Sequence, residues 1–92
     1  MRFGFIGAGN MAGAIVRGMV ASGHPAEQIT LSDPNSAAAQ RLAGDLGVSA
    51  AASNEEVVAA ANYLVLAVKP QVIESALTPL QDAIATHAPA VV

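Results

Sequence analysis

Cysteine and tryptophan are absent from this sequence, and charged side chains are scarce. Without cysteine, the chain has neither a disulfide framework nor thiolate chemistry. Charged residues make up 12% of the chain, whereas typical soluble domains contain about 25%. Only four residues are lysine or arginine, and the formal net charge is -3. This charge balance argues against nucleic acid as a partner, because a phosphate backbone requires a basic surface.

Long apolar runs are also missing. No run approaches the roughly 18 residues that a membrane-spanning helix needs, and the first residues lack the basic segment and long apolar stretch of a signal peptide. We therefore predict a cytoplasmic protein without a membrane partner. Apolar residues nevertheless make up 53% of the 92 residues. With so few charges, part of this apolar surface is expected to lie against something outside the chain.

A glycine-rich stretch near the amino terminus is the most informative feature that is present. A short apolar run over residues 3–6 ends in Gly7-x-Gly9-x-x-Ala12, and a helical pattern follows at once. This order is typical of a dinucleotide-binding βα turn. Gly7 would allow the tight turn, Gly9 would let the backbone approach a pyrophosphate, and Ala12 would let the helix pack closely. The positive end of the helix would then face the phosphates.

The rest of the chain alternates between strand-like and helix-like patterns. Short apolar runs predict strands over residues 2–6, 28–32, 48–51 and 63–68, and the start of a further strand at 90–92. Apolar spacing and capping residues predict helices over residues 10–21, 36–46, 54–61 and 72–86. This alternation predicts an α/β fold, a three-layer, doubly wound parallel sheet of the Rossmann type with strand order 3-2-1-4-5, truncated at its last strand. In that context we favour a dinucleotide site over a purely structural turn.

Apolar spacing also predicts which helix faces are buried. In the first helix, Met11, Ile15 and Met19 have the spacing of one buried face, and Ala14 with Gly18 is the alternative. Gly18 in the same helix is expected to permit close packing, since glycine otherwise weakens a helix. Pro79 is expected to kink or interrupt the last helix.

Asp33 follows the second predicted strand, about 20 residues past the glycine turn, where the dinucleotide fingerprint has an acidic residue. A carboxylate there can accept hydrogen bonds from the adenosine ribose and repel a 2′-phosphate, which favours NAD. The alternative is that Asp33 caps the next helix, with Pro34 as its first residue. Ser32 and Asn35 could instead bind a 2′-phosphate, although no arginine lies in this turn. The residues leave NAD and NADP both open.

Two further sites follow predicted strands at the edge of the sheet where a cofactor would lie. Asn54 could reach the adenosine half of a cofactor, or it could be an ordinary polar residue in the first turn of a capped helix. Lys69 is the only lysine, and with Pro70 it follows the fourth strand, beside the switch point where such sheets bind ligands. The alternative for this pair is a solvated lysine before a helix-starting proline. Its position favours a functional role.

Catalytic machinery is not evident in the sequence. His24 and His87 lie beside prolines in predicted turns and are expected to be surface residues. We find no Ser/His/Asp arrangement, metal-ligand cluster or carboxylate pair at a useful spacing. The sequence therefore predicts a place for a cofactor, but no catalytic residue and no metal site.

Four segments together resemble the amino-terminal domain of pyrroline-5-carboxylate reductase: residues 4–12, the turn 32–34, residues 53–54 and residues 66–71. That family reduces the cyclic imine 1-pyrroline-5-carboxylate to L-proline with NADPH or NADH, in proline biosynthesis. The resemblance favours NADPH slightly, although Asp33 departs from members with a serine or a basic residue nearby. It implies cofactor contacts at Ile6, Gly7, Ala8, Gly9, Asn10, Met11, Ser32, Asp33, Asn54, Ala67, Val68, Lys69 and Pro70.

The resemblance also implies parts that this chain lacks. Family members continue into a helical domain that supplies substrate binding and much of the dimer interface, so we expect residues 1–92 to be the dinucleotide-binding domain alone. The imine would bind only in a full-length enzyme, which we expect to be a homo-oligomer, and the fragment alone would be inactive. Two alternatives stay open: the cofactor domain of a related imine or hydroxy-acid reductase, and a nucleotide-sensing regulatory module.

Overall fold

A parallel β-sheet forms the middle layer of the molecule in the computed structural model, which describes residues 1–91. Within these residues the sheet has five strands in the order β3-β2-β1-β4-β5. The strands are β1 (Phe3–Ile6), β2 (Ile29–Ser32), β3 (Ser49–Ala50), β4 (Tyr63–Leu66) and β5 (Ala90–Val91). Phe3 pairs with both Ile29 and Tyr63, so the three central strands start level. The predicted fold and strand order are confirmed; Val92, predicted to extend the last strand, lies outside the described residues.

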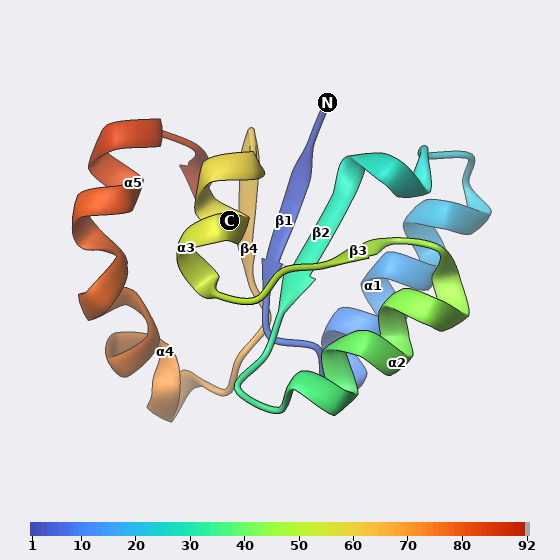
Figure 1. Cartoon of the computed structure of the whole chain (residues 1–92), viewed down its shortest axis with the longest axis horizontal. Helices are drawn as coiled ribbons and strands as arrows, with labels where there is room; N and C mark the ends of the chain where they lie inside the picture. Colours follow the sequence, from blue (N-terminus) through green and yellow to red (C-terminus); the bar gives the residue numbers. More distant parts are fainter. Residues whose placement is uncertain (92) are drawn as a thin grey trace.

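Helices cover both faces of the sheet. They are α1 (Asn10–Ala21), α2 (Ser36–Leu46), α3 (Asn54–Ala60), α4 (Pro70–Leu77) and α5 (Gln81–His87), with 3-10 turns η1 (Ala26–Gln28) and η2 (Thr78–Leu80). Figure 1 shows α1 and α2 on one side of the sheet and α3, α4 and α5 on the other. The strand order therefore reverses at β1, which is the switch point where such sheets bind ligands. Among residues 1–91, no helix is long and apolar enough to cross a membrane.

The buried face of α1 differs from the predicted one. Ala12, Gly13 and Val16 are its buried residues, whereas Met11 is 52% exposed and Ile15 is 40% exposed. The helix begins directly at the glycine turn, so the turn decides which face points inward. Ala12 and Val16 belong to the apolar core on this side of the sheet, and Met19 packs against that core, so the predicted face is confirmed at Met19 and wrong at Met11 and Ile15.

Close approach of a helix to the sheet occurs at Gly4 and not at Gly18. A Cβ atom at Gly18 would meet nothing within 4 Å, so the predicted packing role of this glycine is wrong. A Cβ atom at Gly4 in β1 would lie 2.6 Å from Cγ1 of Val57 and 2.9 Å from Cβ of Ala61. The absence of a side chain at Gly4 thus lets α3 pack directly on the central strand.

The predicted interruption at Pro79 is confirmed. α4 ends at Leu77, η2 contains the proline, and α5 begins at Gln81. Leu80 of η2 is fully buried in the apolar core on this side of the sheet, together with Leu64 of β4. The break in the helix therefore lets the chain bend while it keeps an apolar contact with the sheet.

Candidate functional site

The glycine turn between β1 and α1 is tightly packed on its inner side. Gly7 has a φ of 108°, which side chains rarely allow. Its N–H group donates to the carbonyl oxygen of Ser32 over 2.7 Å, and a Cβ atom at this position would lie 2.4 Å from the carbonyl oxygen of Ala67. The prediction that Gly7 forms the tight turn is confirmed, and the turn is fixed between the ends of β2 and β4.

The outer side of the same turn is open. Gly9 is the N-cap of α1, and no side chain caps the helix there. A Cβ atom at Gly9 would meet nothing within 4 Å. The first N–H groups of a helix have no partner within the helix, and Asn10 and Met11 are exposed. These donors, at the positive end of the helix dipole, suit an anion such as a pyrophosphate.

Asp33 connects the turn after β2 to the glycine turn. Its Oδ2 accepts a hydrogen bond from the N–H of Ala8, and its Oδ1 accepts one from the N–H of Asn35, each over 2.8 Å. The N-cap of α2 is Asn35, whose side chain accepts from the N–H of Ala38 over 3.3 Å. The alternative prediction for Asp33 and Pro34 is therefore wrong: Asp33 does not cap α2, because its carboxylate is held by other N–H groups.

Ser32 and Asn54 connect β2 to the start of α3. Ser32 is 2% exposed, and its hydroxyl donates to Oδ1 of Asn54. This bond orients the side-chain amide and leaves its NH₂ group free to donate elsewhere. Ser53 caps α3, since its side chain accepts from the N–H of Glu56 over 3.3 Å. A direct contact between Ser32 and a cofactor stays a prediction.

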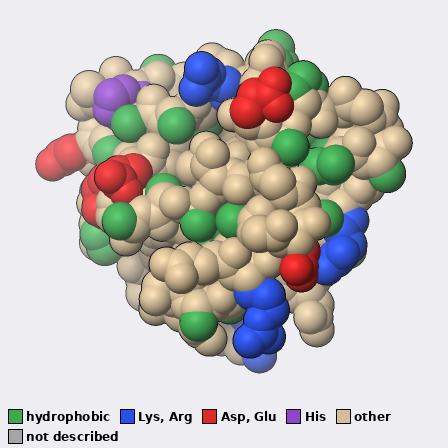
Figure 2. All heavy atoms as spheres, turned by 45° about the vertical axis from the view of Figure 1, so that its right-hand side comes forward, with side chains coloured by type: hydrophobic (Ala, Val, Ile, Leu, Met, Phe, Trp, Pro, Cys, Tyr) green, Lys and Arg blue, Asp and Glu red, His purple; other side chains and the backbone are tan. Residues whose placement is uncertain are grey.

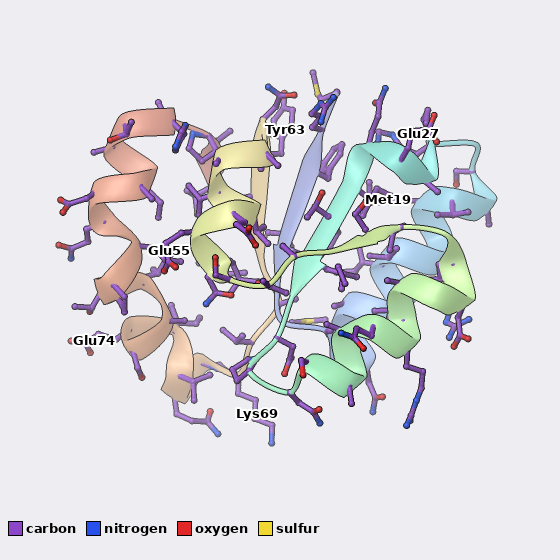
Figure 3. The ribbon with its side chains drawn as sticks, in the orientation of Figure 1. Met19, Glu27, Glu55, Tyr63, Lys69 and Glu74 are labelled. Carbon is purple, nitrogen blue, oxygen red and sulfur yellow. The ribbon has the colours of Figure 1, made fainter. Side chains whose placement is uncertain are left out.

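A cleft of about 550 Å³ lies over the carboxyl ends of the strands, and most of the predicted cofactor residues come together in it. Its lining residues come from the glycine turn, from the turns after β2, β3 and β4, and from α4: Ile6, Gly9, Asp33, Pro34, Asn54, Ala67, Val68, Lys69, Val72, Ser75 and Ala76. Figure 3 shows Lys69 extending from the end of β4 that lies opposite Tyr63. Pro70 is the first residue of α4.

The contribution of α4 to this cleft was not predicted from the sequence. Val72, Ser75 and Ala76 line the cleft, and they are spaced by three and four residues, which places them on one face of a helix. This spacing directly after Lys69-Pro70 is the signal that could have revealed them. Two of these three side chains, Val72 and Ala76, are apolar, which suits a flat ring more than a charged group.

A second groove, of about 500 Å³, runs between α1 and α2. Asn10 lines it, as do Arg17, Arg41 and Asp45. Figure 2, which brings this side of the molecule forward, shows basic and acidic side chains next to one another low on the surface. Gly9 lines both the groove and the cleft, so the glycine turn separates the two hollows.

Neither histidine lines the cleft. His24 packs edge-on against Phe3, with ring centroids 5.1 Å apart, and its Nε2 atom is buried. His24 is therefore half-buried and only in part the predicted surface residue, whereas the prediction is confirmed for His87, which is exposed. Residues 1–91 contain no group of three or more side chains that could hold a metal ion.

With this geometry established, the comparisons with known proteins identify the family. Residues 2–89 match the family described as "NADP oxidoreductase coenzyme F420-dependent". The chain belongs to this family. The matched range contains every residue of the cleft and of the α1–α2 groove, so the candidate site lies entirely within the part shared with the family.

Individual relatives confirm the resemblance predicted from the sequence. Pyrroline-5-carboxylate reductase of Pseudomonas aeruginosa is 42% identical over 83 residues, 90% of this chain and 30% of that protein. The protein of the same name from Pasteurella multocida is 48% identical over 73 residues, 75% of this chain and 26% of that protein. A solved pyrroline-5-carboxylate reductase from Coxiella burnetii has a TM-score of 0.86 and 31% identity, covering 91% of this chain and 31% of that one. The chain thus spans less than a third of the length of these relatives.

Proposed function

We propose that this chain binds NAD(P)H across the carboxyl edge of its sheet, as the amino-terminal cofactor domain of a pyrroline-5-carboxylate reductase. The full enzyme would reduce the cyclic imine to L-proline. The observation that carries the proposal is the open outer side of the glycine turn, where Gly9 leaves the first N–H groups of α1 accessible beside the cleft. The names of the relatives at 42% and 48% identity support the reaction.

The two halves of the cleft suit the two halves of a dinucleotide. The half near Asn54, whose side-chain NH₂ group is free to donate, fits ribose hydroxyls, and the half formed by Ala67, Val68 and α4 is mainly apolar and fits a nicotinamide ring. When bound, the nicotinamide would supply the hydride for the imine. The residues of this chain would bind the phosphates, orient the ring against the substrate and exclude water from one side of it.

The substrate and the assembly belong to the rest of the proposed enzyme. We expect the imine to bind in a helical domain beyond these residues, the enzyme to be a cytoplasmic homo-oligomer, and the fragment alone to be inactive. We also expect NADPH to be preferred, which the family's description as NADP oxidoreductases supports.

A pair of glycine variants tests the cofactor site. Gly9→Val places a branched side chain where the phosphates would lie, and Gly44→Val places the same side chain on α2, away from the cleft. Neither new Cβ atom would meet an atom within 4 Å, so both variants should fold. We expect Gly9→Val to weaken NADPH binding at least tenfold, about 1.4 kcal/mol, and Gly44→Val to bind as the wild type does. Titration of ¹⁵N-labelled protein up to millimolar cofactor measures the dissociation constants, even if they are weak.

The titration also gives results that would refute the proposal. Equal binding by Gly9→Val and Gly44→Val would place the phosphates elsewhere. No saturable binding of NADPH or NADH by the wild type would remove the cofactor function altogether. Urea unfolding of each variant checks that lost binding does not come from lost structure.

A further inference from the structure

The carboxylate of Asp33 has two backbone partners that lie far apart in the sequence. Oδ2 accepts from Ala8 in the glycine turn, 25 residues away, and Oδ1 accepts from Asn35, two residues away. We call this pair of hydrogen bonds the Asp33 bridge. Hydrogen bonds from N–H groups to a carboxylate are short and stronger than neutral ones. The bridge therefore holds two loops together at the edge of the sheet where the cofactor is proposed to bind.

The bridge fixes the N–H group of Ala8, the residue directly before the proposed phosphate site at Gly9. Ala8 lies between Gly7, which is fixed against Ser32 and Ala67, and Gly9, whose surroundings are open. Fixing the N–H of Ala8 limits the orientation of the peptide that leads into Gly9 and α1. A turn held in its binding conformation before the ligand arrives costs less ordering entropy on binding.

The bridge also bears on the choice between NADH and NADPH. In the dinucleotide fingerprint, an acidic residue at this position accepts bonds from the ribose and disfavours a 2′-phosphate. Here each oxygen of Asp33 already accepts an N–H group, and two such donors offset part of the negative charge. The side chain is also only partly exposed.

We infer that Asp33 is a positioning residue that strengthens binding of both cofactors through Ala8, and that it does not select between them. The inference rests on the proposed cofactor function. It predicts that removal of the bridge weakens the binding of NADH and the binding of NADPH by the same factor. A residue that reads the ribose directly would instead change the ratio of the two dissociation constants.

The test compares wild type, Asp33→Asn, Asp33→Ser and the control Asp82→Asn, which removes the same charge from an exposed site on α5. In ¹H–¹⁵N spectra without cofactor, we expect the Ala8 amide proton to move upfield and exchange faster in both Asp33 variants, and to be unchanged in Asp82→Asn. In titrations, we expect the dissociation constants of NADH and NADPH both to rise about tenfold in the Asp33 variants. Their ratio should stay within threefold of the wild-type ratio.

Each possible result has a separate meaning. Tighter binding of NADPH with weaker binding of NADH in Asp33→Ser would overturn the inference and make Asp33 the selecting residue. An unchanged Ala8 amide in both Asp33 variants would show that the bridge is absent in solution and would also overturn it. If the wild type bound neither cofactor, the proposed function would fail and the inference with it, whereas a changed ratio in a chain that binds both would overturn the inference alone.

Discussion

The backbone N–H groups at the two ends of the sheet differ in whether the chain itself supplies their partners. At the amino end, the chain pairs its own groups: the N–H of Arg2 donates to Oδ1 of Asn62 over 2.8 Å, and the N–H of Asn62 donates back to the carbonyl oxygen of Arg2 over 2.9 Å. At the carboxyl end, the start of α1 after Gly9 has no side-chain cap. One end is closed by the chain itself, whereas the other leaves the first N–H groups of α1 without a side-chain partner.

Aromatic packing reinforces the contrast. Phe3 at the amino end stacks on Tyr63, with ring centroids 5.2 Å apart, and meets His24 edge-on. Figure 3 places Tyr63 at one end of β4 and Lys69 at the other. The amino end thus has the features of a structural core, and the carboxyl end combines a rigid inner layer at Gly7 with an open outer layer at Gly9. Stability and binding should therefore respond to different residues.

The largest effect, a loss of folding stability, is expected from Gly7→Ala, which adds a side chain to the rigid inner layer of the glycine turn. The new Cβ atom would lie 2.4 Å from the carbonyl oxygen of Ala67, at a φ of 108°. Backbone strain of about 1–3 kcal/mol adds to overpacking of about 1–3 kcal/mol. The sum is a large share of the roughly 5–15 kcal/mol that stabilises a typical domain. Urea unfolding followed by circular dichroism measures the loss.

Gly23→Ala is the matched control at the opposite end of the sheet. Gly23 also has a positive φ, 97°, but a Cβ atom there would meet nothing within 4 Å. It should show the strain alone, about 1–3 kcal/mol, and keep cofactor binding. Equal losses in the two variants would mean that the contact between Gly7 and Ala67 does not constrain the turn.

The fold was predictable because its signals are local. The break at Pro79 and the tight turn at Gly7 each depend on residues adjacent in sequence. Alternation of short apolar runs with helical patterns then fixed the strand order through the handedness of the crossovers. Predicting these features requires no knowledge of side-chain contacts.

The features that the sequence did not reveal depend on contacts across space. The buried face of α1 is set by how the helix leaves the glycine turn, so the spacing of Met11 and Ile15 was misleading. The bond between Asp33 and Ala8 joins residues 25 positions apart, and no local pattern encodes it.

An intermediate effect is expected from two asparagines at opposite ends of the sheet. Asn62→Ala removes the acceptor of the Arg2 N–H, which should cost about 1 kcal/mol of folding stability and leave cofactor binding unchanged. Asn54→Ala removes the oriented amide in the cleft, so it should weaken cofactor binding severalfold. Calorimetric titration with NADPH, beside urea unfolding, measures both quantities for each variant. Loss of binding in Asn62→Ala would show that the two ends are coupled.

The smallest effect is expected from Lys69→Gln. Lys69 lines the mouth of the cleft but is exposed, so water and salt screen its attraction to the phosphates. We expect NADPH to bind about two- to fivefold more weakly at low ionic strength, with the difference largely gone near 0.5 M salt, as for other exposed charges at a binding site. Arg2→Gln removes a positive charge at the amino end and should leave NADPH binding unchanged at both salt concentrations. If Arg2→Gln weakened binding as much as Lys69→Gln, the effect would come from net charge and not from the position of Lys69 at the cleft.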